Sequence, residues 1–292
     1  MNSSTISKGQ SFKEIGLFIV IAVLLMAVCD VLLLEYSANP HYAITLRMWS
    51  VGISAFIVLA LFKRPLASLG WRWGKAKYHA MAILLPVLYA GIAYFLADAI
   101  GLATLGSDAT LKAFVAKAGF EEFGAAGLLF SVLFLLVGAM PGNYATALGE
   151  EIGWRGFLAP RTNTAFGFAA GTLFTGVVWG LWHMPLVILG GYHAGGALAY
   201  EIGSFMLLVV SISGILAWLR TASGSLWPAA TLHAAHNLII QKIFDPLTTE
   251  GTSHVTMVGE FGVLLAMIAA LASVPFWVLG YRSWRAQHPP LL

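Results

Sequence analysis

Apolar stretches long enough to cross a lipid bilayer recur along this sequence from one end to the other. A membrane-spanning helix needs about 20 residues, because the hydrocarbon core is about 30 Å thick. Only 10% of the 292 residues are charged and 59% are hydrophobic, whereas soluble domains carry about 25% charged residues. These features exclude an ordinary soluble domain and predict a membrane protein.

The apolar runs predict an all-α fold, a polytopic membrane helix bundle of about eight transmembrane helices. The runs cover approximately residues 15–34, 42–62, 80–104, 127–158, 168–190, 198–219, 226–243 and 260–280. The first run is too long for a signal peptide and has no small-residue cleavage pattern, so we expect it to remain as a helix. No linker or internal repeat separates the runs. We therefore predict a single transmembrane domain at 15–281, with tails at 1–14 and 282–292.

The basic residues predict how the helices are oriented. With a cytoplasmic N-terminus, twelve of the sixteen lysines and arginines fall on the cytoplasmic side. These are Lys8, Lys13, Lys63, Arg64, Arg72, Lys75, Lys77, Arg155, Arg161, Arg220, Arg282 and Arg285, whereas Arg47, Lys112, Lys117 and Lys242 lie elsewhere. The positive-inside rule then predicts an integral multi-pass protein of the cell (inner) membrane with both termini cytoplasmic. The basic residues form no patch, so we expect no nucleic-acid partner.

Two smaller features of the sequence are the charged segment at residues 108–125 and the cysteine content. Residues 108–125 mix Phe114 and Phe120 with charged residues, which predicts an amphipathic helix on the outer surface, with a solvated loop as the alternative. Cys29 is the only cysteine, so there is no internal disulfide and no pair of cysteines for a metal.

The fourth run carries two adjacent acids, Glu150 and Glu151. Residues four apart share a helix face, so Glu151 can pair with Arg155 in the favoured acid-first order. Glu150 points about 100° away from that pair. Charges within a bilayer are costly and are functional candidates by default, and an unpaired carboxylate is a candidate general base for water. The alternative is that both acids only bind basic groups on other helices.

Two later runs carry histidines. His183 lies in a very apolar part of the fifth run, where a lone histidine is more often a core residue than a catalyst. The seventh run contains His233 and Asn237, which are four residues apart and share a face. His236 lies three residues from His233 and could compete for its role.

Depth along the helices gives a further expectation. If the fourth run ends near Ala159 and the seventh begins near Leu226, Glu150 lies roughly 14 Å and His233 roughly 10 Å from the inner surface, at a rise of about 1.5 Å per residue. Side chains on these two runs can therefore meet.

His183 joins them only if the fifth run starts late, near Gly171, so that residues 162–170 form an elbow. Residues 141–143, Pro-Gly-Asn, predict a break within the fourth run, where neighbouring helices must satisfy the freed backbone groups.

These motifs resemble those of the CPBP intramembrane protease family, also known as type II CAAX prenyl endopeptidases and Abi bacteriocin-immunity proteins. The family pattern is Glu-Glu-x-x-x-Arg, then Phe-x-x-x-His, then His-x-x-x-Asn or Asp, on separate helices. The matching residues are Glu150-Glu151 with Arg155, Trp179 with His183, and His233 with Asn237. The motif-bearing core spans about residues 125–243. Trp179 replaces the usual phenylalanine, which we expect to affect packing more than chemistry.

The resemblance implies an intramembrane endopeptidase. Glu150 would activate water, His183 would assist, and His233 with Asn237 would stabilise the oxyanion. Glu151 and Arg155 would support the site, with Arg155 holding a substrate carboxylate as a less favoured alternative. The implied partners are the lipid bilayer and a membrane-associated peptide or lipidated protein, such as a prenylated CAAX protein whose last three residues are removed.

Three other functions compete with this interpretation. A zinc protease could use the same acids and histidines as ligands, but there is no His-Glu-x-x-His motif, so we expect no cofactor. A membrane immunity or partner-binding protein could retain the residues for structure. A transporter is the third alternative, but the sequence shows no repeated halves.

Overall fold

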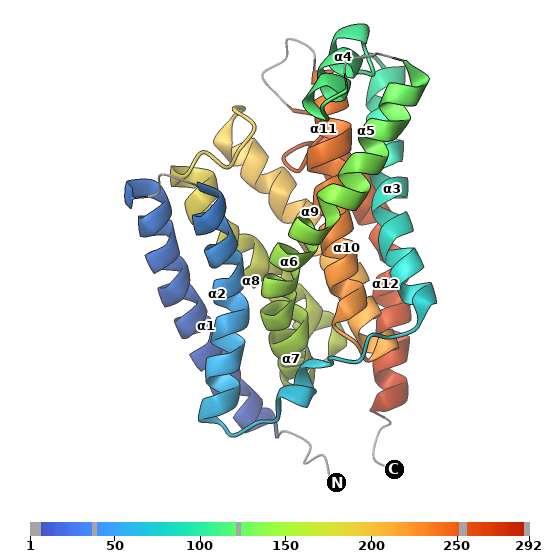
Figure 1. Cartoon of the computed structure of the whole chain (residues 1–292). Coiled ribbons are helices and arrows are strands. Elements are labelled where there is room, and N and C mark those ends of the chain that lie inside the picture. Colours follow the sequence, from blue (N-terminus) through green and yellow to red (C-terminus); the bar gives the residue numbers. More distant parts are fainter. Residues whose placement is uncertain (1–6, 37–39, 121–123, 251–255, 289–292) are drawn as a thin grey trace.

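The computed structural model describes residues 7–36, 40–120, 124–250 and 256–288, which form a helical bundle (Figure 1). Six of its helices are long and apolar enough to span a membrane. They are α1 with its π-helical extension η1 (Lys8–Val31 and Leu32–Tyr36), α2 (Pro40–Leu61), α3 (Ala76–Ala99), α8 (Phe168–Leu189), α9 (Leu198–Ser223) and α12 (Val263–Gln287). Parts of the predicted tails, residues 8–14 and 282–287, are therefore helical.

A seventh span is broken. α5 (Ala125–Gly138) meets a second helical stretch, Met140–Phe166, at an angle of 40°. The second stretch comprises α6 (Met140–Glu151), the π-helical η3 (Ile152–Leu158) and α7 (Ala159–Phe166). The predicted break in the fourth run is confirmed, and it lies at Ala139.

The remaining predicted run lies inside the bundle. It consists of α10 (Trp227–Asn237) and the π-helical η4 (Leu238–Phe244), and it contacts α3, α6 and α9. Twelve of its residues are buried, including His233 and His236. The predicted polytopic helix bundle is thus confirmed, because the eight predicted runs correspond to six spans, one broken span and this interior helix.

Short elements close the two ends of the bundle. At one end lie α4 (Asp108–Lys117), α11 (Asp245–Leu247) and the antiparallel strands β1 (Ala103–Leu105) and β2 (Thr248–Glu250). The 3-10 helix η2 (Leu66–Leu69) follows α2 at the other end.

The amphipathic helix predicted at 108–125 is confirmed for α4, where the side chain of Ser107 caps the first turn and Phe114 is buried. The helix is shorter than predicted, since it ends before Gly119 at φ +86°. Part of the prediction, residues 121–123, lies outside the described residues.

Glycines bring α6 against α2 and so position the fourth-run motif. A Cβ atom at Gly149 would lie 2.8 Å from the ring of Trp49, and one at Gly52 would lie 2.6 Å from the backbone oxygen of Gly149. Small residues allow this close approach of helices in membranes. Since Glu150 follows Gly149 directly, the close packing fixes its backbone beside α2.

The predicted end of the fourth run near Ala159 is wrong. The helix continues as α7 to Phe166, and Gly167 alone makes the turn into α8, with φ +83°. A late start of the fifth run near Gly171 is also wrong, because a Cβ atom there would lie 2.6 Å from the backbone nitrogen of Asn163, so α7 and α8 pack there as helices. No elbow forms at residues 162–170.

The tight hairpin brings Glu150 and His183 together in a different way from the one predicted. Glu150 precedes Gly167 by 17 residues and His183 follows it by 16, which places both roughly 25 Å along their helices from the turn. The predicted depth of roughly 14 Å for Glu150 is therefore too small, because it assumed an earlier helix end.

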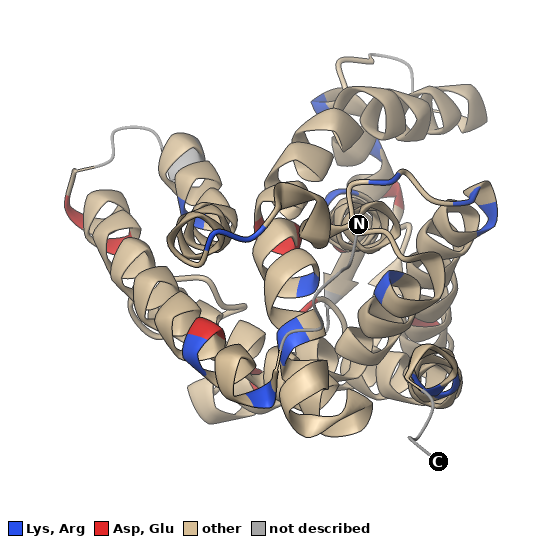
Figure 2. Cartoon of the chain, turned by 90° about the horizontal axis from the view of Figure 1, so that it is seen from below, with Lys and Arg blue, Asp and Glu red and all other residues tan. Residues whose placement is uncertain are grey.

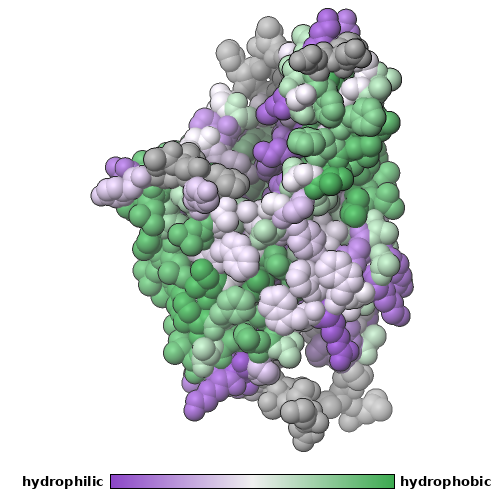
Figure 3. Space-filling view, in the orientation of Figure 1, coloured by the Kyte–Doolittle hydropathy of each residue, from purple (hydrophilic) through white to green (hydrophobic). Residues whose placement is uncertain are grey.

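The two ends of the bundle differ in charge. The start of α1, the α7–α8 turn and the end of α12 lie at the lower end in Figure 1, and lysines and arginines surround this end when it is seen from below (Figure 2). Glu14 is fully buried there, between Arg64 at 2.9 Å and Arg161 at 2.6 Å. Between the ends, exposed side chains are largely apolar, as expected for helices that face lipid (Figure 3).

Candidate active site

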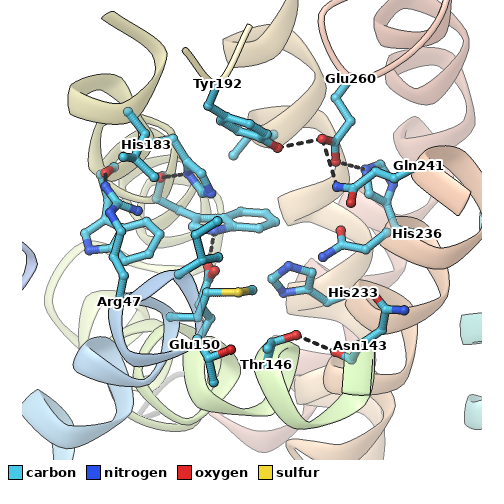
Figure 4. Close-up of a pocket in the computed structure, with 18 of the residues that line it drawn as sticks. Arg47, Asn143, Thr146, Glu150, His183, Tyr192, His233, His236, Gln241 and Glu260 are labelled. Carbon is cyan, nitrogen blue, oxygen red and sulfur yellow. Dashed lines mark hydrogen bonds and ion pairs between the residues drawn. The ribbon is translucent and has the colours of Figure 1, made fainter. Parts of the chain in front are cut away.

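A pocket of about 690 Å³ lies inside the bundle, between α2, α6, α8, α9 and α10. The four predicted catalytic residues, Glu150, His183, His233 and Asn237, all line it. Figure 4 shows Glu150 and His183 on one side of the pocket and His233 across from them. The structure therefore brings together residues from three separate helices, as the motifs predicted.

Glu150 is 1% exposed and has no ion-pair partner among the described residues. Its Oε2 accepts hydrogen bonds from the indole nitrogens of Trp154, at 3.1 Å, and Trp179, at 2.7 Å. Within the described part of the chain, no hydrogen bond is made to Oε1. One carboxylate oxygen is thus fixed by two N–H donors, and the other is available to a water or a substrate.

The expectation that Trp179 affects packing more than chemistry is wrong. Its indole N–H is the closer of the two donors to Glu150, and a phenylalanine ring has no such donor. Its ring also covers the guanidinium of Arg155, whose central carbon lies 4.1 Å from the ring centre. The departure from the family pattern therefore adds a direct contact to the candidate base.

His183 presents its second ring nitrogen to the pocket. Its Nδ1 lies 2.9 Å from the backbone oxygen of Trp179. A carbonyl oxygen can only accept, so Nδ1 carries the proton and Nε2 of the neutral ring holds a lone pair. The ring is held in place by aromatic contacts with Trp182 and Phe205.

Glu151 joins two motifs. Its Oε1 accepts from Arg155 Nη1 at 2.8 Å, which confirms the predicted pair, and it also lies 2.9 Å from His233 Nδ1. The carboxylate therefore fixes the His233 ring and favours its doubly protonated form, in which Nε2–H is a donor toward the pocket. Arg155 is buried, also donates to Ser213, and does not line the pocket, so the alternative role of holding a substrate carboxylate gains no support.

Backbone geometry changes directly after two of the motifs. The π-helical η3 begins immediately after Glu151, and the π-helical η4 immediately after Asn237. Such π-helical turns are rare in proteins, and those that occur often lie at functional sites. They mark the helix positions from which the motif side chains enter the pocket.

His236 does not compete with His233. Its Nδ1 lies 2.5 Å from the hydroxyl of Tyr89, and its Nε2 lies 3.4 Å from Glu260 Oε1. Both ring nitrogens are therefore occupied by protein groups. The structure assigns His236 to a separate polar cluster on the same pocket.

The centre of this cluster is Glu260, which sequence reasoning missed as a pocket residue. Its Oε2 also accepts from the Tyr192 hydroxyl at 2.5 Å and from Gln241 Nε2 at 3.0 Å (Figure 4). Burial raises the pKa of Glu260, but hydrogen bonds from His236, Tyr192 and Gln241 outweigh it and lower the pKa to about 2. The polar side chains of the seventh run were a signal for this cluster, but nothing in the sequence shows that the segment before α12 folds back onto it.

Arg47 is a second residue that was missed. It is 1% exposed, pairs with Asp30 at 2.5 Å, donates to the backbone oxygen of Trp182 at 2.6 Å and lines the pocket beside the Trp182 ring. Opposite charges in the first two apolar runs were the available signal, because intramembrane charges tend to pair.

The pocket contains acids and histidines, which are possible metal ligands. Among the residues that the structure describes, no group of three or more His, Cys, Asp or Glu side chains is placed to hold one metal ion. His183 Nδ1 and His233 Nδ1 are both engaged by oxygens of the protein, and this leaves the Nε2 atom of each ring available to the pocket.

Comparison with known proteins agrees with the motifs. Residues 127–239 match the family model described as type II CAAX prenyl endopeptidase Rce1-like. The chain is also similar to CAAX prenyl protease 2 of Methanococcus maripaludis, with 28% identity over 96 residues, which cover 30% of this chain and 31% of the relative. The chain thus matches about a third of the length of that relative. The predicted resemblance is confirmed, because residues 127–239 of this chain are similar to type II CAAX prenyl endopeptidase Rce1-like proteins, which are members of the CPBP family.

Proposed function

We propose that this protein is an intramembrane endopeptidase that hydrolyses a peptide bond near the C-terminus of a membrane-associated substrate. The observation that carries this proposal is the Glu150 carboxylate, which has one oxygen fixed by two indoles and the other available in a pocket shared with His183. A buried acid held in this way has a high energetic cost, and general base chemistry accounts for its presence.

In the proposed reaction, a water lies between Glu150 Oε1 and His183 Nε2. Glu150 takes a proton from the water while the oxygen atom of the water attacks the peptide carbonyl carbon. The C–N bond of the resulting tetrahedral intermediate then breaks, and the departing nitrogen receives the proton from Glu150. The products are a new carboxylic acid and a new amine, which then ionise to a carboxylate and an ammonium group, and Glu150 is again ionised.

His233 and Asn237 would stabilise the oxyanion of that intermediate. His233 supplies Nε2–H, since its Nδ1 is held by Glu151, and Asn237 supplies its amide N–H from the next turn of α10. A single donor of this kind is worth about 2.7–4 kcal/mol in the transition state. Glu151 acts indirectly, because it fixes the His233 ring and favours its protonated form, and Arg155 holds Glu151 in place.

The reaction as proposed uses no metal. Among the described acids and histidines, no group of three or more is placed to hold one metal ion, which favours the metal-free route. Measuring the metal content of the purified protein, and its activity after exhaustive chelation, tests the proposal. Stoichiometric zinc that is lost together with activity would favour the zinc alternative.

The substrate class is inferred from the pocket and the family. The name of the archaeal relative points to prenylated CAAX proteins. Leu186, Leu208 and Ile212 form an apolar part of the pocket wall, which suits an apolar side chain or a lipid chain. We propose a lipid-anchored or membrane-inserted peptide cleaved close to its end.

The test is a comparison of protein termini in membranes of cells that carry wild-type protein or Glu150→Gln. We expect new termini in membrane proteins that depend on Glu150. Glu201→Gln is a matched control, because Glu201 is also buried but holds the backbone of the loop after α8. Preserved biological function in Glu150→Gln, with no difference in termini, would instead favour a non-catalytic immunity or partner-binding protein.

A further inference from the structure

The pocket opens at the end of the bundle opposite to the chain termini. Its lining includes Leu33 at the end of α1, Ile44 at the start of α2, residues 190–192 after α8, and Glu260 before α12. These helix ends all lie away from Lys8, where α1 begins. In Figure 3, hydrophilic residues gather in the upper centre of the molecule, between α1–α2 and α5.

The position of His183 along α8 also indicates that the pocket opens at the end opposite to the termini. His183 lies 15 residues after Phe168, where α8 begins, and 6 residues before Leu189, where it ends. These separations correspond to roughly 22 Å and 9 Å. Among the described residues, none of those that connect the helices at the lower end, such as 62–75 or 220–226, lines the pocket.

The lower end carries the basic residues. Lys8 and Lys13 lie at the start of α1, five lie between α2 and the first turn of α3, and Arg282 and Arg285 lie near the end of α12. The excess of lysine and arginine in short loops sets the orientation of membrane proteins and assigns this end to the cytoplasm. The opposite end then faces the exterior.

We propose that the pocket receives its substrate from the extracytoplasmic face of the membrane. The substrate class is then a membrane-anchored peptide whose scissile bond is presented on that side. This inference rests on the proposed peptidase function for its substrate, but the direction of the pocket is independent of catalysis. It differs from the sequence-based expectation of a site near the cytoplasmic surface, which assumed that the fourth helix ends near Ala159 rather than at Phe166.

Cysteine labelling in intact cells tests the direction. The wild-type protein is the blank, because Cys29 is its only cysteine and is buried. Single variants place a thiol at Glu35→Cys, exposed at the end of η1; at Thr146→Cys, on the pocket wall; and at Ser68→Cys, exposed at the lower end. Each is treated with a membrane-impermeant maleimide before and after permeabilisation.

We expect Glu35→Cys and Thr146→Cys to react equally before and after permeabilisation, and Ser68→Cys to react only afterwards. The reverse pattern would overturn the orientation and would favour substrates on the cytoplasmic side, such as a cytoplasmic prenylated protein. Two results for Thr146→Cys would overturn the direction of access. In one, its thiol stays unreactive. In the other, it reacts only after permeabilisation while Glu35→Cys reacts in intact cells. Failure of the peptidase function itself would appear separately, as unchanged protein termini in Glu150→Gln cells with the labelling pattern intact.

Discussion

Two buried carboxylates share one pocket and differ in how completely the protein occupies them. Glu260 is held on both oxygens, by His236 on one and by Tyr192 and Gln241 on the other. Glu150 is held on Oε2 only, by two tryptophans. Burial alone therefore does not identify a catalytic acid, because both side chains are buried.

The difference lies in the remaining capacity to accept hydrogen bonds. A carboxylate whose oxygens are engaged by protein donors is fixed and stays ionised, so it serves structure. A carboxylate with one oxygen open to a pocket can hold and deprotonate water.

The largest difference is expected in turnover. Glu150→Gln removes the base and should lower the rate of peptide cleavage by about 10²–10⁴-fold. Glu260→Gln keeps a similar shape and leaves Glu150 in place. The folded fraction of this variant should therefore retain most of the wild-type turnover. Rates are compared per folded molecule, and equal losses in both variants would contradict the comparison.

Stability at low pH should depend on Glu260. The pKa of this group is lowered from 4.5 to about 2 in the folded protein. Its contribution to stability is therefore fully present above pH 4.5 and is lost as the pH falls toward 2, an effect of about 3 kcal/mol.

Unfolding in detergent between pH 6 and pH 2 measures this effect. In Glu260→Gln the loss of stability over that range should be smaller than in the wild type. The same pH profile in both proteins would show that the hydrogen bonds to Glu260 do not stabilise its charge.

The indole of Trp179 gives a finer test of Glu150. Trp179→Phe removes a hydrogen bond to a charged group, worth about 1.5–3 kcal/mol, and should lower turnover because Glu150 is less firmly held. Trp182→Phe is the matched control on the same helix, since the Trp182 indole nitrogen is buried without a hydrogen-bond partner among the described residues. Equal effects of the two substitutions on turnover would show that ring size matters and the N–H does not.

The smallest effect is expected for the Tyr192 hydroxyl. Tyr192→Phe removes one hydrogen bond to Glu260 but keeps the ring contacts with Phe205 and Phe261, so stability should fall by about 1 kcal/mol with little change in turnover. Tyr78→Phe, which loses a comparable bond to the Ala222 backbone at the other end of the bundle, is the control. A larger loss of turnover in Tyr192→Phe than in Trp179→Phe would reverse the roles assigned to the two carboxylates.

Much of the fold and the site could be predicted from sequence because both depend on local patterns. Apolar run lengths define membrane helices, and residues four apart share a face, which is why the Glu151–Arg155 pair was predicted. The convergence of Glu150, His183 and His233 was implied by the resemblance of the three motifs to a known family, whereas the late start of the fifth run that would bring His183 to the site was wrong. A single motif would not have sufficed, since a lone apolar histidine is usually structural.

Other features depend on contacts between distant segments that no local pattern encodes. The continuation of the fourth helix to Phe166 depends on Gly167, a single residue that permits the turn. The position of Glu260 depends on how the segment before α12 folds back onto η4. The role of Trp179 was misjudged because a tryptophan was compared with phenylalanine by size, while its N–H has meaning only beside Glu150.

The central claim is that Glu150 activates water rather than attacking the substrate itself. Once a substrate is identified, the oxygen-18 content of Glu150 and of the product after a single turnover in enriched water tests this claim. Direct attack by water predicts the heavy isotope in the new carboxylate of the product and none in Glu150. Heavy oxygen recovered in the Glu150 side chain, with an unlabelled product, would show a covalent intermediate and would contradict this account.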